Sequence, residues 1–123
     1  MAYEDLTPAG SRETPLPSAA RTTTGASGNL PGYGATKTLR AQLNVTVAAG
    51  TSPTLDVLIE DSLDGGATWN TVGTFAQKTA AGREVINITN PFSPLLRISW
   101  TIGGTTPSFT FAVDWYAARG TWT

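Results

Sequence analysis

The stretch TKTLRAQLNVTVA, residues 36–48, indicates the fold class of this chain of 123 residues. Apolar side chains occupy every second position from residue 39 onward, and polar side chains fill the positions between them. A period of two places one set on the buried face of a β-strand and the other on its solvent face. The apolar set is Leu39, Ala41, Leu43, Val45 and Val47, and the polar set is Thr38, Arg40, Gln42, Asn44 and Thr46. The stretch therefore predicts a strand that covers a hydrophobic core.

The same alternation recurs in most of the chain that follows. It predicts further strands over residues 54–61, 68–75, 83–89, 95–102 and 108–118, separated by turns that contain Gly or Pro. GGTTP, residues 103–107, is expected to turn the chain so that the last two strands form a hairpin. Trp100 and Trp115 fall on apolar positions of those strands and are expected in the core. Because no segment has a helical period, we predict an all-β fold, a small antiparallel β-sandwich of jelly-roll-like or barrel-like form.

Residues 1–35 differ from the rest because they are rich in Pro, Gly and Thr and follow neither the strand nor the helix period. Such a segment cannot build a core of its own, so it is expected to lie extended against its own domain or a neighbouring subunit. We predict an extended N-terminal interaction arm over residues 1–35 and a β-sandwich domain over residues 36–123. One or two short extra strands near Arg21 or Thr121 fit the same fold. The apolar side chains expected to bind a partner are Tyr3, Leu6, Leu16, Leu30, Tyr33 and Trp122.

A second informative stretch is SLDGGATW, from Ser62 to Trp69, between two predicted strands. Asp64 precedes two glycines that tolerate a positive φ, and a short carboxylate accepts hydrogen bonds from backbone N–H groups a few residues on. The indole of Trp69 can then cover the turn while its N–H keeps a polar partner. These residues predict a hairpin turn. Two alternatives are an aromatic side chain that stacks on a sugar, and a pair of carboxylates, Asp61 and Asp64, that holds a calcium ion.

The stretch resembles the Asp-box, S-x-D-x-G-x-T-W, a β-hairpin element of sialidases and other propellers. The matching residues are Ser62, Asp64, Gly66, Thr68 and Trp69. The resemblance implies that the Asp side chain braces the turn and that the element lies away from any catalytic centre. A propeller itself is excluded because the chain is too short for four blades.

The amino-acid composition argues against several classes of partner and of chemistry. Eight basic and nine acidic residues nearly cancel, and no Lys or Arg cluster is present, so we expect neither a nucleic acid nor a membrane as partner. The chain has no His and no Cys, which removes the side chains most used in acid–base, nucleophilic and thiolate chemistry. Glu60, Asp61 and Asp64 form the one acidic cluster, at a strand end where a solvated loop is expected. We therefore predict a protein that is not an enzyme and that uses no metal or cofactor.

An extended arm on a small sandwich rich in Thr, Gly and Ala resembles the head decoration, or cement, proteins of tailed bacteriophages. The resemblance extends over the whole chain as an architecture. It implies the major capsid protein as partner, a homotrimer, a place on the outer capsid surface, and stabilisation of the head by bridging capsid subunits. The first 17 residues have no apolar segment, which favours synthesis in the host cytoplasm without a secretory signal.

Two other functions fit the same sequence. One is a carbohydrate-binding module or adhesin on a phage particle, with Trp69 or Trp122 as the platform that stacks on a glycan. The other is a head-to-tail connector or minor tail subunit built on the same sandwich.

Overall fold

The computed structural model describes residues 10–119, in which every regular element is a β-strand. Of the predicted partner-binding residues, Tyr3, Leu6 and Trp122 lie outside this range. The strands are β1 (Gly10–Arg21), β2 (Gly25–Ala26), β3 (Thr36–Ser62), β4 (Asn70–Thr74), β5 (Gly82–Ile88) and β6 (Leu95–Arg119). All strand pairs in it are antiparallel, so the predicted all-β antiparallel sandwich is confirmed. The described residues include no helix long and apolar enough to cross a membrane.

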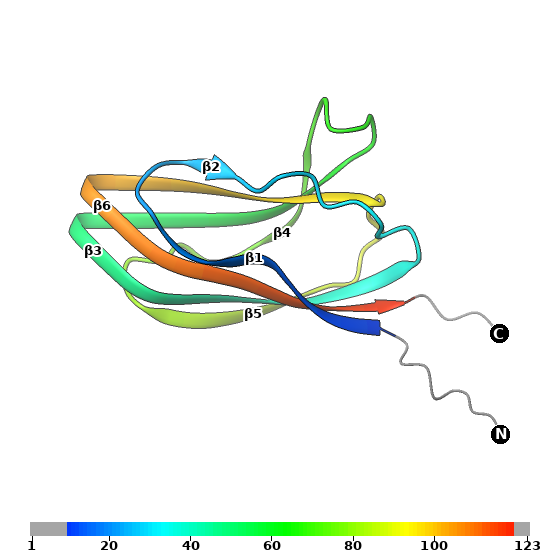
Figure 1. The fold of residues 1–123 in the computed structure, drawn as a ribbon, viewed down its shortest axis with the longest axis horizontal. Coiled ribbons are helices and arrows are strands. Elements are labelled where there is room, and N and C mark those ends of the chain that lie inside the picture. Colours follow the sequence, from blue (N-terminus) through cyan, green and yellow to red (C-terminus); the bar gives the residue numbers. More distant parts are fainter. Residues whose placement is uncertain (1–9, 120–123) are drawn as a thin grey trace, which may run out of the picture.

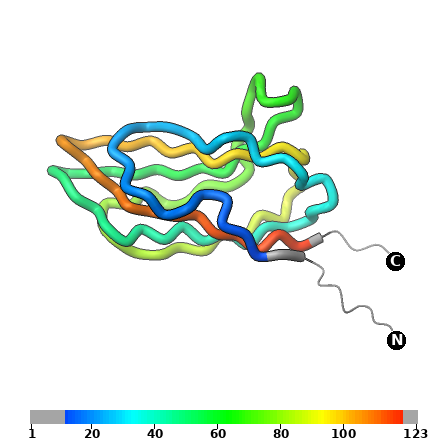
Figure 2. Tube along the Cα trace, in the orientation of Figure 1, coloured from blue at the N-terminus to red at the C-terminus, as the bar shows by residue number. Residues whose placement is uncertain are grey.

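Two long strands organise the fold. β3 and β6 pair along almost their whole length and bend together, so one continuous sheet folds into two layers (Figure 1). In one layer the strand order is β1, the second half of β6, the first half of β3, and β5. In the other layer β2 flanks the first half of β6, and β4 flanks the second half of β3. Figure 2 shows the two layers meeting at the bend, at the left of the view.

The predicted hairpin at residues 103–107 is wrong. GGTTP lies inside β6, and the segments before and after it pair with β3 instead of with each other. The predicted strands over residues 36–48 and 54–61 are likewise two halves of β3. Gly and Pro mark these positions because the strand bends there, and a bend between layers has the same local composition as a turn.

The bend is built from two similar tetrapeptides, GTSP starting at Gly50 and GTTP starting at Gly104. Both glycines have positive φ, 113° at Gly50 and 110° at Gly104, and so do Ser52 and Thr106, at 49° and 46°. A Cβ on Gly50 would lie 2.7 Å from the carbonyl oxygen of Thr106, and one on Gly104 would lie 2.7 Å from that of Ser52. Each glycine thus packs against the backbone of the other tetrapeptide, and the corner closes because neither has a side chain.

The core lies between the layers and follows the predicted alternation. Leu39, Ala41, Leu43 and Val45 are buried, as the period of two in residues 36–48 predicts. Val47 is 49% exposed, so its predicted burial is wrong; the pairing register shifts between Val45 and Val47, which changes the phase of the strand. From β6, Phe109, Phe111, Val113 and Trp115 are buried, while Trp100 is partly buried against them.

The predicted boundary at residue 35 does not separate an arm from the sandwich. Residues 10–21 form β1, which pairs with β6, and Leu16 is 5% exposed within the core. Further along, Leu30 pairs with Leu96 through two backbone hydrogen bonds of 2.8 and 3.0 Å. The strand lacks alternation because the register shifts on both sides of Leu16, where prolines interrupt it. Prolines are tolerated there because β1 is an edge strand.

Because β1 belongs to the domain, deletion of residues 1–35 should prevent cooperative folding, whereas deletion of residues 1–9 should leave it intact. Leu16→Ala should lower the free energy of unfolding by about 2–5 kcal/mol, since it opens a cavity in the core. Urea denaturation followed by circular dichroism measures all three. A protein without residues 1–35 that unfolds cooperatively with wild-type stability would contradict the assignment of β1.

The close packing of the two glycines at the bend leads to a second testable prediction. Gly104→Ala places a Cβ against backbone at a positive φ, so it should destabilise the fold by at least about 2 kcal/mol. Gly28→Ala is the matched control because its Cβ meets nothing within 4 Å. That control should change stability by less than about 0.5 kcal/mol. Equal melting temperatures for the two variants would show that the corner does not depend on the glycine.

Candidate functional site

The turn after β3 is held by side chains of the SLDGGATW stretch. The carboxylate of Asp64 accepts hydrogen bonds from the backbone N–H of Thr68 at 2.8 Å and from its hydroxyl at 2.6 Å. The Ser62 hydroxyl donates to Asp64 at 2.8 Å and accepts from the N–H of Gly66 at 2.8 Å. The indole N–H of Trp69 donates to the carbonyl oxygen of Gly66 at 3.1 Å. The five residues of the pattern therefore bond to one another within the turn.

These bonds also set the ionisation of Asp64. The hydroxyl and backbone N–H of Thr68, followed by the hydroxyl of Ser62, lower the pKa of Asp64 to about 2. The cause is hydrogen bonding to the charged form of an exposed carboxyl group. Asp64 is therefore a carboxylate near neutral pH and uses both oxygens inside the turn.

The geometry gives little support to the two alternative roles of this loop, a sugar platform at Trp69 and a calcium site at Asp61 and Asp64. One face of Trp69 is covered by the guanidinium of Arg97, 4.4 Å from the ring centroid, and Arg97 is held by Glu60 at 2.7 Å. Asp61 is 7% exposed and accepts a hydrogen bond from the N–H of Ser93 at 2.8 Å. Across residues 10–119, no group of three or more His, Cys, Asp or Glu side chains could hold a metal ion. The polar groups of the pattern are thus engaged in hydrogen bonds within the turn.

A partly buried polar network joins the N-terminal segment to the core. The hydroxyl of Tyr33 donates to a carboxylate oxygen of Glu13 at 2.5 Å, and the indole N–H of Trp115 donates to the same oxygen at 3.0 Å. The rings of Tyr33 and Trp115 meet edge to face, with centroids 5.5 Å apart. Burial, followed by the bond to Glu13, raises the pKa of Tyr33 to about 12, so the hydroxyl keeps its proton.

Three of the predicted partner-binding residues of the arm lie in the described part of the chain, and all three have partners within the domain. Leu16 is in the core, and Leu30 and Tyr33 pack against the core as partly buried side chains. They were predicted to bind another subunit because residues 10–21 show no strand period, although they form β1.

One hollow lies at the end of the sandwich opposite the bend. Its volume is about 440 Å³ and its lining is mostly small or apolar: Gly34, Ala35, Thr36, Lys37, Thr89, Pro91 and Phe92. The pairs Gly10 with Ala118 and Thr36 with Arg119 bring both described ends of the chain to this end of the molecule (Figure 1). We call this surface the terminal end.

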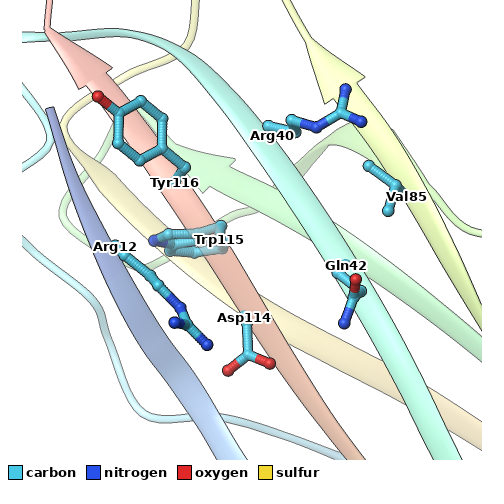
Figure 3. Close-up of a pocket in the computed structure, with 7 residues that line it drawn as sticks. All are labelled: Arg12, Arg40, Gln42, Val85, Asp114, Trp115 and Tyr116. Atoms are coloured by element: carbon cyan, nitrogen blue, oxygen red, sulfur yellow. The ribbon is translucent and has the colours of Figure 1, made fainter.

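A second hollow, of about 270 Å³, lies on the outer face of the layer that contains β1 and β5. Figure 3 shows its lining, in which Tyr116 and Asp114 come from β6, Arg12 from β1, Arg40 and Gln42 from β3, and Val85 from β5. Tyr116 is 43% exposed. The two arginines beside Tyr116 come from segments far from it in the sequence, Arg12 in β1 and Arg40 in β3, so no local pattern reveals this hollow.

No family model and no curated protein matches this sequence. The structure is similar to the CBM36-1 domain of a multidomain xylanase from the hindgut metagenome of Trinervitermes trinervoides. The TM-score is 0.52 and the identity 13%, over 91% of this chain and 99% of that domain. It is also similar to a chain of infectious bursal disease virus, Gt strain, with a TM-score of 0.52 and 12% identity. That match covers 94% of this chain and 34% of the viral chain.

At such low identity these likenesses show the fold alone. The chain is a small antiparallel β-sandwich of a type found in a CBM domain and in a virus structure.

The turn predicts a pH-dependent contribution to stability. A carboxyl group whose pKa is lower in the folded than in the unfolded state stabilises the fold above its unfolded pKa. The Asp64 contribution should therefore be complete above pH of about 4 and lost as the pH falls towards about 2. Asp64→Asn should lower the melting temperature at pH 7, and its difference from wild type should shrink between these two pH values. A difference that does not change with pH would contradict the role of the carboxylate.

Proposed function

We propose that this chain is a capsid decoration protein, a non-catalytic subunit that binds the major capsid protein on the outer surface of a virus particle. The observation that carries the proposal is the terminal end, where both described chain ends lie beside the hollow of about 440 Å³. The sequence attaches Tyr3 and Leu6 before this point and Trp122 after it. The two segments that carry these apolar side chains therefore join the described domain at the terminal end.

Such a surface suits attachment to another protein. Aromatic side chains that enter pockets supply much of the binding energy at protein interfaces. In the hollow, Phe92 is only partly buried, and the neighbouring Lys37 and Thr89 are exposed. A capsid presents the same partner surface many times, so modest affinity at each copy can decorate and stabilise the whole shell.

The homotrimer expected from the sequence is part of this proposal. The outer face of the β2 and β4 layer carries the uncharged side chains Thr54, Leu58, Thr74, Ser99 and Thr101. Its charged side chains are Asp56 and the ion pair of Glu60 with Arg97. A strand face with little unpaired charge offers little repulsion to a second copy. A closed ring of three copies at a local three-fold position buries such faces without leaving an open end.

The likeness to a chain of infectious bursal disease virus supports the proposal only as a shared fold. A head-to-tail connector or minor tail subunit with the same sandwich is the competing assignment. The two assignments differ in where the protein sits on a particle and in how many copies are present.

The test uses particles of the virus that encodes the chain. Mass spectrometry should find the protein at a copy number comparable to that of the major capsid protein, and electron microscopy should place it on the head in groups of three. Purified protein should co-sediment with empty heads. Absence from particles, or a few copies confined to the tail, would overturn the decoration role, and monomers on the head would overturn the trimer alone.

The terminal end can be tested by filling its hollow. Thr89→Arg places a long charged side chain in the hollow from an exposed position, so it should weaken co-sedimentation with heads at least about tenfold while the melting temperature stays close to wild type. Thr79→Arg makes the same change at an exposed position next to Lys78, which pairs with Leu55 near the bend. Equal binding by the two variants would exclude the hollow as the attachment surface.

A further inference from the structure

We propose that the outer face of the layer containing β1 and β5 carries a binding site for a sugar with an anionic substituent, centred on Tyr116. The site is separate from the terminal end and does not depend on the decoration role.

The sheet register puts a guanidinium group on each side of an exposed aromatic ring. Arg12 of β1 and Arg40 of β3 both pair with Tyr116 of β6, from opposite sides. Paired residues in neighbouring strands point to the same face, so the three side chains form one row across the layer (Figure 3). The side chains of Tyr116, Arg12 and Arg40 are exposed and line a shallow hollow, and one N–H group of Arg40 donates to the side-chain oxygen of Asn87 at 3.0 Å.

The neighbouring row of paired residues supplies side chains that can hydrogen-bond the hydroxyl groups of a sugar. Gln42 pairs with Asp114, and both line the hollow. Asp114 accepts a hydrogen bond from the hydroxyl of Thr14 at 2.7 Å, which holds the carboxylate at the edge of the hollow. An amide and a carboxylate beside a ring can bond the hydroxyls of a sugar, while the apolar face of the sugar packs on the aromatic ring. The volume of about 270 Å³ is near the lower end of ligand pockets and suits one or two sugar rings.

Charge on this face selects an anionic ligand. Arg83 pairs with Asn44 and so shares the face with Arg12 and Arg40. Within residues 10–119 the ion pairs are Lys78 with Glu84 and Arg97 with Glu60, so these three arginines have no carboxylate partner there. Asp114 is the one acidic side chain on the face in that part of the chain, although the protein as a whole has a net charge of −1. Arginine binds carboxylate and sulfate groups through paired N–H donors, so the site fits a uronic acid or a sulfated sugar.

Trp69, the aromatic side chain in the described part of the chain that was predicted to stack on a sugar, lies beside an arginine that is already paired. One face of its ring is covered by Arg97, whose charge is already paired with Glu60. Tyr116 has an exposed ring and lies between two arginines that have no carboxylate partner within residues 10–119. It is therefore the better candidate for a sugar-binding side chain.

The experiment titrates the full chain, by calorimetry at low ionic strength, with oligogalacturonate, a heparin-derived oligosaccharide and the neutral cellohexaose. We expect binding to one or both anionic sugars, at least about tenfold weaker binding to cellohexaose, and weaker binding as salt is added. Tyr116→Ala should weaken binding about tenfold, whereas Tyr116→Phe should largely retain it, because the ring supplies the packing.

Substitutions of single arginines distinguish direct contact with the sugar from long-range electrostatic attraction to it. Arg12→Gln and Arg40→Gln should each weaken binding at least about tenfold, while Arg83→Gln, which removes the same charge two rows away, should weaken it no more than about threefold. Melting temperatures show that each variant folds. Three outcomes would overturn the proposal: no binding to either anionic sugar, equal binding by Tyr116→Ala and wild type, or polyglutamate binding as tightly as oligogalacturonate. None of these outcomes bears on attachment to a capsid.

Discussion

The close approach of a glycine in each strand to the backbone of the other strand at the bend is the constraint on which the two-layer arrangement depends. Gly50 and Gly104 each lie against the backbone of the opposite tetrapeptide, at a distance that leaves no room for a Cβ. This close approach lets β3 and β6 stay paired while both pass from one layer to the other. Because both strands turn together, their apolar faces meet across the core, and the edge strands of each layer take their places beside them.

Most acidic groups of the described residues act within the fold. Asp64 braces a turn, Glu13 accepts from Tyr33 and Trp115, and Glu60 holds Arg97. A carboxylate already bonded by several donors has little capacity left for a ligand or a proton transfer. The arginines on one outer face and the hollow at one end of the sandwich lie outside these contacts.

The two proposed surfaces arise from the same topology in different ways. The terminal end exists because β1 and β6 run antiparallel at the edge of one layer, which brings the two chain ends together. The site at Tyr116 exists because β6 is flanked by β1 on one side and β3 on the other, so that Arg12 and Arg40 approach from both sides. A particle subunit that binds protein at one surface and a sugar at another would use both.

The sequence by itself determined most strand segments beyond residue 36, because alternation and turn chemistry are local: the period in residues 36–48 and the bonds around Asp64 need no distant segment. Only the tertiary structure decided how strands pair. It showed that prolines in β1 interrupt a real edge strand, that residues 103–107 form a bend, and that Arg12 lies beside Tyr116. These features depend on contacts between segments that are far apart in the sequence, and local composition carries no signal for them.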